Sequence, residues 1–184
     1  MKLRPTSTQA QTSVNLAFDI ETNGIDSTYI HCVVTQNLDT GEVIEYNDQA
    51  SKNYSVVNAV CDLETADNII SHNGIMFDVP EIKKHFPFWE GKAKHWDTLI
   101  LSRFFHPNLL DIDLRRKWHK MPARLYGSHS LEAYGYRLQC YKDDFGKTTD
   151  WTDWSQEMQD YCRQDVAILT KLWTHFQKSL KALS

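Results

Sequence analysis

Near the start of the chain, hydrophobic and polar residues alternate one by one. Apolar side chains occupy positions 14, 16, 18 and 20, and mostly polar or small ones lie between them. This period of two residues predicts a β-strand over residues 14–22. Runs rich in β-branched residues predict further strands at residues 29–37 and 42–46, each preceded by turn residues. The chain is therefore expected to begin as three antiparallel strands.

Beyond residue 55 the pattern changes to helices that alternate with short strands. Apolar residues three and four apart predict helices at residues 56–63, 77–86, 99–105, 130–138 and 157–180. Short strands are predicted at residues 68–71 and 95–97. Strands joined through helices lie parallel to one another. Residues 108–127 are expected to form a loop-like insertion, and residues 142–153 a polar connector.

Three antiparallel strands followed by parallel ones, with helices on the faces, are typical of a ribonuclease H-like fold. We therefore expect an α/β domain in which a mixed five-stranded sheet carries helices on both faces. Residues 1–13 are polar and are predicted to form a mobile N-terminal tail. Residues 14–184 are long enough for one domain with its own hydrophobic core.

Composition narrows the possible functions. The 184 residues include 24 acids and 20 bases, for a formal net charge of -4. This balance argues against binding nucleic acid through bulk positive charge, but not against a nucleic-acid enzyme whose acids hold metal ions. The four cysteines form no Cys-x-x-Cys pair, which argues against a zinc site and favours reduced thiols. With neither a signal peptide nor a membrane-spanning run, a cytoplasmic location is expected.

Candidate chemistry begins with two acids at the end of the first strand. Asp19 and Glu21 are two residues apart, so a strand places both on one face. Their charges repel unless a cation lies between them, and oxygen ligands suit magnesium or manganese. Two solvated acids at a strand end would give the same pattern, which is common. Further acids stand at Asp78, where a helix begins after a strand, and at Asp165, one helical turn beyond Tyr161.

These acids can converge, because strand ends and helix starts cluster at one edge of an α/β sheet. Four carboxylates can hold two divalent ions about 3.5–4 Å apart, which is the two-metal arrangement of nucleases. One ion activates a bound water and aims it at phosphorus, and the other stabilises the leaving 3′ oxygen. Because a phenol is a poor base at neutral pH, Tyr161 is assigned to orienting the water. The pattern therefore indicates phosphodiester hydrolysis.

The same motifs carry a family resemblance. Asp19-Ile20-Glu21, Asp78 and Tyr161-x-x-x-Asp165 resemble the Asp-Glu-Asp-Asp superfamily of 3′–5′ exonucleases, in its tyrosine branch. The stretches at residues 71–74, 77–80, 97–103, 127–138 and 141–145 look like the proofreading domain of T-seven-like phage family A DNA polymerases. The resemblance covers nearly all of residues 16–180.

The resemblance implies a ribonuclease H-like fold, two bound Mg²⁺ or Mn²⁺ ions, and stepwise release of nucleoside monophosphates from a DNA 3′ end. The DNA would be single-stranded or frayed, and the location would be the host cytoplasm if a phage encodes the chain. Metal-binding roles carry over to Asp19, Glu21, Asp78 and Asp165, and a water-positioning role to Tyr161. We further expect substrate contacts from Ile20, Thr22, Asn73, Phe77, Ser128 and His129.

Alternative functions stay open at this point. The substrate could be RNA, since no motif reads the 2′-hydroxyl. A non-catalytic module that binds nucleic acid or a polymerase is a third hypothesis, although all four acids are present. The family continues into a polymerase where this chain stops, so the chain is an excised domain, a free-standing exonuclease, or one part of a split polymerase with a separate polymerase partner.

Several residues have two interpretations. Asp97 is expected to cap the helix that begins at Thr98, although a strand end could also place it near the metals. His72 is expected to brace its turn rather than to contact the substrate, and Ser128 could simply cap the helix that follows. Five basic residues interleaved with aromatics in the insertion suit either a nucleic-acid contact or a solvated loop.

Overall fold

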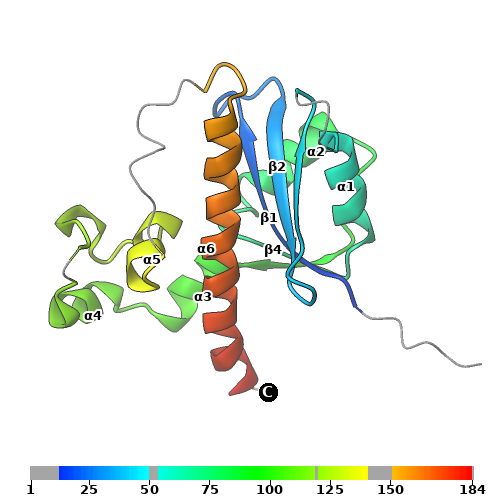
Figure 1. Ribbon diagram of the computed structural model, residues 1–184. Coiled ribbons are helices and arrows are strands. Elements are labelled where there is room, and N and C mark those ends of the chain that lie inside the picture. The colour runs from blue at the N-terminus through cyan, green and yellow to red at the C-terminus, as the bar shows by residue number, and fades with distance from the viewer. Residues whose placement is uncertain (1–12, 50–53, 119, 141–150, 184) are drawn as a thin grey trace, which may run out of the picture.

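The computed structural model describes residues 13–49, 54–118, 120–140 and 151–183. Five strands form one mixed sheet in the order β3-β2-β1-β4-β5 (Figure 1). They are β1 (Asn15–Thr22), β2 (Ile30–Asn37), β3 (Val43–Asn47), β4 (Asn68–Ser71) and β5 (Lys94–Asp97). The first three strands pair antiparallel, whereas β4 runs parallel to both β1 and β5. The expected ribonuclease H-like architecture is confirmed.

Helices cover both faces of this sheet. In Figure 1, the long helix α6 runs along one face, and α1 and α2 lie on the other side. The helices are α1 (Val56–Thr65), α2 (Asp78–His85), α3 (Thr98–Phe105), α4 (Leu109–Arg116), α5 (Leu131–Arg137) and α6 (Gln156–Lys181). Both α3 and α5 pack beside α6. The sheet is therefore buried on both sides, as parallel pairing requires.

The alternation along β1 decides which side chains lie on each face of the sheet. Leu16, Phe18 and Ile20 are buried in the apolar cluster beneath α1 and α2. Ala17 lies in the opposite cluster, beneath α6. Because successive strand residues point to opposite faces, Asp19 and Glu21 share the face of Ala17. Both carboxylates are thereby directed toward α6.

The expectation of a loop-like insertion at residues 108–127 is wrong. This stretch contains α4 and a short 3₁₀ turn, Ala123–Leu125. Leu109 and Ile112 pack in the apolar cluster that also holds part of α6, and Trp118 packs beside the 3₁₀ turn. Only three inward-facing positions mark a helix this short, and one of them is an acid, so the apolar period is too weak to read. Residues 1–12 of the expected N-terminal tail and residues 142–150 of the expected polar connector lie outside the described residues.

A buried ion pair ties α4 to α5. Arg137 Nη2 lies 2.6 Å from Asp113 Oδ2, and Arg137 Nε lies 3.0 Å from Asp113 Oδ1. Asp113 also accepts hydrogen bonds from Trp118 Nε1 and from the backbone N–H of Gly127, each at 2.8 Å. Arg137 Nη1 donates to the Ser128 carbonyl at 2.8 Å. These bonds fix the turn that precedes α5.

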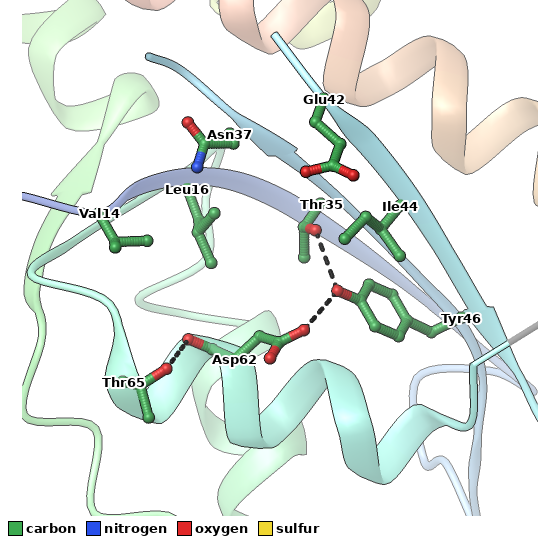
Figure 2. A pocket seen from close by; sticks show the side chains of 9 residues that line it. All are labelled: Val14, Leu16, Thr35, Asn37, Glu42, Ile44, Tyr46, Asp62 and Thr65. Atoms are coloured by element: carbon green, nitrogen blue, oxygen red, sulfur yellow. Dashed lines mark hydrogen bonds between the residues drawn. The ribbon is translucent and has the colours of Figure 1, made fainter. Parts of the chain in front are cut away.

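A cavity of about 200 Å³ lies on the α1 side of the sheet, beneath the β2–β3 hairpin (Figure 2). The buried Tyr46 hydroxyl donates to Asp62 Oδ2 at 2.6 Å and contacts Thr35 Oγ1 at 3.4 Å. Burial and the hydrogen bond to Asp62 raise the pKa of Tyr46, so its phenol stays protonated and links α1 to the sheet.

Among the described helices, none combines the length and apolar character needed to cross a bilayer.

Candidate active site

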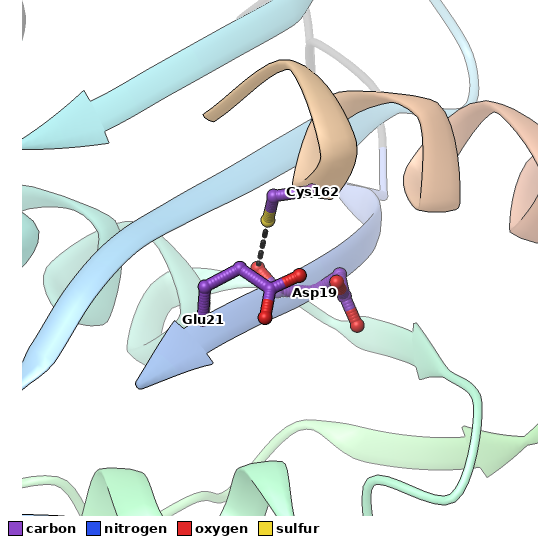
Figure 3. Close-up of side chains that lie close together, drawn as sticks. All are labelled: Asp19, Glu21 and Cys162. Atoms are coloured by element: carbon purple, nitrogen blue, oxygen red, sulfur yellow. Dashed lines mark hydrogen bonds between the residues drawn. The ribbon is translucent and has the colours of Figure 1, made fainter. Parts of the chain in front are cut away.

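Two carboxylates of β1 form the centre of the site (Figure 3). Asp19 and Glu21 are half-buried, and one oxygen of each lies with Cys162 Sγ in a group no wider than 4.8 Å. The thiol donates to the backbone carbonyl of Asp19 at 3.4 Å. Burial raises the pKa of Cys162 well above its usual value, so the thiol is neutral. A neutral thiol is a poor ligand for a hard cation, which leaves the carboxylate oxygens as the candidate ligands.

Helix α6 adds a phenol and a third carboxylate. Tyr161 is half-buried, and Asp165, one turn further along, is buried. Burial raises the pKa of Tyr161, and the negative charges of Asp165, Glu21 and Asp19 raise it further. The phenol therefore remains protonated at neutral pH. It can hold a water by hydrogen bonding, but it cannot serve as a base.

The fourth acid opens α2. Asp78 is buried, and its Oδ1 has no hydrogen-bond partner among the residues that the structure describes. Burial, together with the negative charges of Asp97 and Asp165, raises the pKa of Asp78 to about 7, although a backbone hydrogen bond from Ile20 opposes the shift. A buried carboxylate oxygen without a donor, in a cluster of like charges, is the environment that a divalent cation stabilises. The residues present therefore fit such an ion.

Close packing fixes the turn that delivers Asp78. A Cβ atom at Gly74 would lie 2.0 Å from Ser71 Oγ and 2.9 Å from Asp78 Oδ2. Position 74, in the loop between β4 and α2, is therefore suited to glycine, because any larger residue would require Ser71 and Asp78 to shift. Asp165 acts on the pKa of both Asp78 and Tyr161, and Asp19 and Glu21 act on that of Tyr161, so the four expected acids and the phenol gather from β1, α2 and α6.

Asp97 holds the same turn from the other side. It caps α3 by accepting from Leu99 N at 2.9 Å, as expected. It also accepts from the backbone N–H groups of Asn73, at 3.0 Å, and Ile75, at 3.2 Å. The sequence analysis did not predict these hydrogen bonds to the loop. The position of Asp97 at a strand end was the only signal for them. Asp97 therefore couples α3 to the loop between β4 and α2.

His72 braces this region, as expected. Its Nδ1 lies 2.9 Å from Thr98 Oγ1, and Thr98 Oγ1 in turn donates to the Ser71 carbonyl at 3.0 Å. Burial lowers the pKa of His72 to about 4, so the ring is neutral near pH 7. A neutral ring adds no positive charge beside the carboxylates.

The residues expected to contact substrate fall into two groups. Ile20 and Thr22 are buried: the Ile20 side chain lies in the core beneath α1 and α2, and Thr22 Oγ1 donates to the Gly24 carbonyl at 2.9 Å. Phe77 packs partly buried against that same core. The β-strand alternation points the Ile20 side chain away from the acids, and a substrate contact from Ile20 stays a prediction. Asn73 is exposed and has a positive φ of 66°.

Ser128 and His129 lie in the turn before α5 and are half-buried. His129 Nδ1 contacts Ser102 Oγ at 2.6 Å, which ties the turn to α3. Ser128 is not the helix cap, because Ser130 accepts from Ala133 N while Ser128 Oγ donates to Ser130 Oγ at 2.9 Å.

A family model of the RNase_H superfamily matches residues 16–177. The DNA-directed DNA polymerases of Escherichia phage T7 and Enterobacteria phage T3 are each 33% identical to this chain, over 180 and 182 residues. These matches cover 84% and 85% of this chain but only 25% and 26% of the polymerases. The chain therefore spans about a quarter of the length of these relatives.

Solved structures share the fold. Brucella melitensis NrnC with bound Mg²⁺ superposes with a TM-score of 0.59 at 19% identity, covering 93% of this chain and 75% of NrnC. The Aedes aegypti Nibbler EXO domain superposes with a TM-score of 0.61 at 13% identity, covering 94% of this chain and 82% of that domain. At these identities the likeness shows the fold alone.

Proposed function

We propose, from the premise that the chain belongs to the RNase_H superfamily, that it is a metal-dependent 3′–5′ exonuclease releasing nucleoside monophosphates from DNA. The family match and the sequence similarity to phage polymerases identify the chain as an RNase H-like nuclease. The polarity, the substrate and a two-metal mechanism are our proposal. The observation that carries it is the convergence of four carboxylates from β1, α2 and α6 around a protonated phenol.

In the proposed reaction, Asp19, Glu21, Asp78 and Asp165 would hold two Mg²⁺ or Mn²⁺ ions, whose chemistry is to acidify a water and to offset charge on the phosphate. Tyr161 hydrogen-bonds the attacking water and orients it toward phosphorus. Its raised pKa keeps the proton in place throughout. The chain's own contribution is therefore to collect negative charge at one edge of the sheet and to aim the nucleophile.

Substrate contacts are assigned to the residues beside this edge. Asn73 projects from the turn that Asp97 fixes, and Ser128 and His129 lie in the turn that Arg137 fixes. We propose DNA rather than RNA as the substrate because the 33% identical relatives are DNA polymerases. We propose a proofreading or DNA-degrading role in phage replication in the host cytoplasm, with a separate polymerase as a candidate partner.

A labelled-oligomer assay tests the proposal. The purified chain is incubated with 5′-labelled single-stranded DNA and Mg²⁺ or Mn²⁺, alongside a matched RNA oligomer. We expect a ladder that shortens from the 3′ end of DNA and that EDTA abolishes. Faster shortening of RNA would reassign the substrate, and loss of the 5′ label as a mononucleotide would reverse the polarity. If neither metal supports hydrolysis, the proposed exonuclease activity would be rejected, and a non-catalytic module that binds nucleic acid or a polymerase would be favoured.

Replacing Tyr161 by phenylalanine should lower kcat by about tenfold to a hundredfold, because the water loses one orienting hydrogen bond. The metal concentration that gives half the maximal rate should not change, since the phenol is not a ligand. The pH–rate profile should keep its shape, because the phenol is already protonated over the working range. Initial rates over a pH and Mn²⁺ series measure all three.

Tyr54→Phe is the matched control, since Tyr54 is exposed on the α1 side of the sheet, against Tyr46. It should leave the rate unchanged. A Tyr161→Phe enzyme at full rate would show that the phenol does not position the water.

A further inference from the structure

The segment just before α6 is attached to the second strand of the sheet. His31 Nε2 lies 2.9 Å from the Trp151 carbonyl, and the Tyr29 hydroxyl donates to the Thr152 carbonyl at 2.7 Å. A carbonyl only accepts, so Nε2 of His31 carries the proton. His31 is only 3% exposed, and its ring packs in a T-shaped arrangement with the ring of Tyr29, with centroids 4.6 Å apart. Tyr29 and His31, two residues apart at the start of β2, thus hold two successive carbonyls, those of Trp151 and Thr152.

The segment held in this way reaches the site through one aromatic contact. The rings of Trp151 and Tyr161 pack edge to face, with centroids 5.8 Å apart and planes at 82°. Trp151 also packs against the apolar cluster between the sheet and α6. A continuous path therefore leads from β2 through Trp151 to the phenol among the carboxylates.

Tyr161 needs such a support. Helix α6 fixes its backbone, but the side chain can still rotate about its Cα–Cβ bond between staggered positions. The ring is half-buried, and the carboxylates of Asp165, Glu21 and Asp19 lie close enough to act on its pKa. An indole packed against the phenol ring limits the directions that the hydroxyl can take.

We propose that Trp151, held by His31 and Tyr29, is a positioning residue that fixes the orientation of Tyr161. This inference rests on the proposed exonuclease function and deepens it. It differs from simple core packing in one respect: the effect of Trp151 on the reaction passes through the Tyr161 hydroxyl.

A double-mutant cycle isolates that effect. The wild-type chain, Trp151→Leu, Tyr161→Phe and the double variant are compared for kcat and KM on the DNA oligomer at saturating Mn²⁺. Trp151→Leu should lower kcat about tenfold and change KM less than about twofold, because a misplaced group mainly slows the reaction. In the Tyr161→Phe background the same change should alter kcat by less than about twofold, since no hydroxyl remains to be positioned. An equal loss in both backgrounds, or no loss in either, would overturn the proposal.

Two further variants examine the support. His31→Gln keeps a nitrogen donor near the position of Nε2, whereas His31→Leu removes it. The leucine variant should reproduce the loss of kcat, and the glutamine variant should restore it. Equal rates in the two variants would show that the hydrogen bond to the Trp151 carbonyl does not matter. Trp154→Leu is the matched control, because Trp154 packs in the same apolar cluster. It should lower the melting temperature. Its effect on kcat should be the same with tyrosine or phenylalanine at position 161.

A measurement independent of activity completes the test. In protein with labelled tyrosine rings, the Tyr161 signals are assigned by their absence in Tyr161→Phe. They should move in Trp151→Leu, because the ring current of the indole acts only on nearby nuclei. Unmoved signals would overturn the inference whatever the activity. A wild-type chain without hydrolysis would instead overturn the proposed function, whereas normal hydrolysis that does not depend on Trp151 would overturn only this inference.

Discussion

Replacing Asp19 by asparagine should lower the rate of DNA hydrolysis by about a thousandfold or more, because one of the charges that would bind the metal ions is lost. Asparagine keeps the shape of the side chain, and Asp19 is half-buried on the central strand β1. Circular dichroism and the melting temperature should therefore stay close to those of the wild-type chain. Initial rates on 5′-labelled DNA at several Mn²⁺ concentrations measure the loss.

Asp165→Asn should have a similar effect from the other side of the site. Asp160→Asn is the matched control on the same helix: Asp160 is exposed and accepts from Gln156 Nε2 at 3.1 Å within α6. The control should hydrolyse DNA at the wild-type rate. Full activity in both Asp19→Asn and Asp165→Asn would falsify the two-metal mechanism, because neither carboxylate could then be required.

Replacing Asp113 by alanine should lower the free energy of unfolding by about 3–5 kcal/mol, because the Arg137 guanidinium stays buried without its counter-charge. The side chains of Asp113 and Arg137 are 0% and 7% exposed. Trp118 Nε1 and the Gly127 N–H would lose their acceptor as well. For a chain of this size the melting temperature should fall by about 6–20 °C, measured by thermal unfolding.

The exposed pair between Arg124 and Glu132 is the control, with its two side chains 55% and 41% exposed. Glu132→Ala should change stability by less than about 1 kcal/mol. In the double variant Asp113→Ala with Arg137→Leu, part of the lost stability should return, since no buried charge remains. A loss after Asp113→Ala no larger than that after Glu132→Ala would contradict the buried pair as the link between α4 and α5.

The same pair predicts a pH dependence. Burial alone would raise the pKa of Asp113, but the hydrogen bonds from Arg137, Gly127 and Trp118, with the charge of Arg137, hold it below its usual value. A carboxyl whose pKa is lowered by folding stabilises the protein above its unfolded pKa. That contribution is lost as the pH falls through the lower, folded value. Asp113→Ala should therefore unfold with a smaller dependence on pH in the acid range.

The parts of the fold that were predictable are those with a strong period. The alternation in β1 identifies the strand and the shared face of Asp19 and Glu21, and the long apolar face of α6 identifies the helix that carries Tyr161 and Asp165. Convergence of the acids follows from strand ends and helix starts, which are visible in sequence.

The parts that were missed depend on partners distant in the chain. Helix α4 presents Asp113 inward, and a buried acid looks like a surface residue until Arg137 is known to reach it. Asp97 holds backbone amides of a turn that precedes it by more than twenty residues. Trp151 lies at the end of a polar stretch, and only the folded chain shows that His31 holds it.

The placement of Asp19 on the first strand and Asp165 on the last helix has a consequence for synthesis. A ribosome releases β1 and α2 long before α6, so a growing chain carries some of the carboxylates without the remaining acid and the phenol. The four acids and the phenol come together only after α6 has packed across the sheet. Under the proposed function, a growing chain would therefore gain nuclease activity only after α6 has left the ribosome and packed across the sheet.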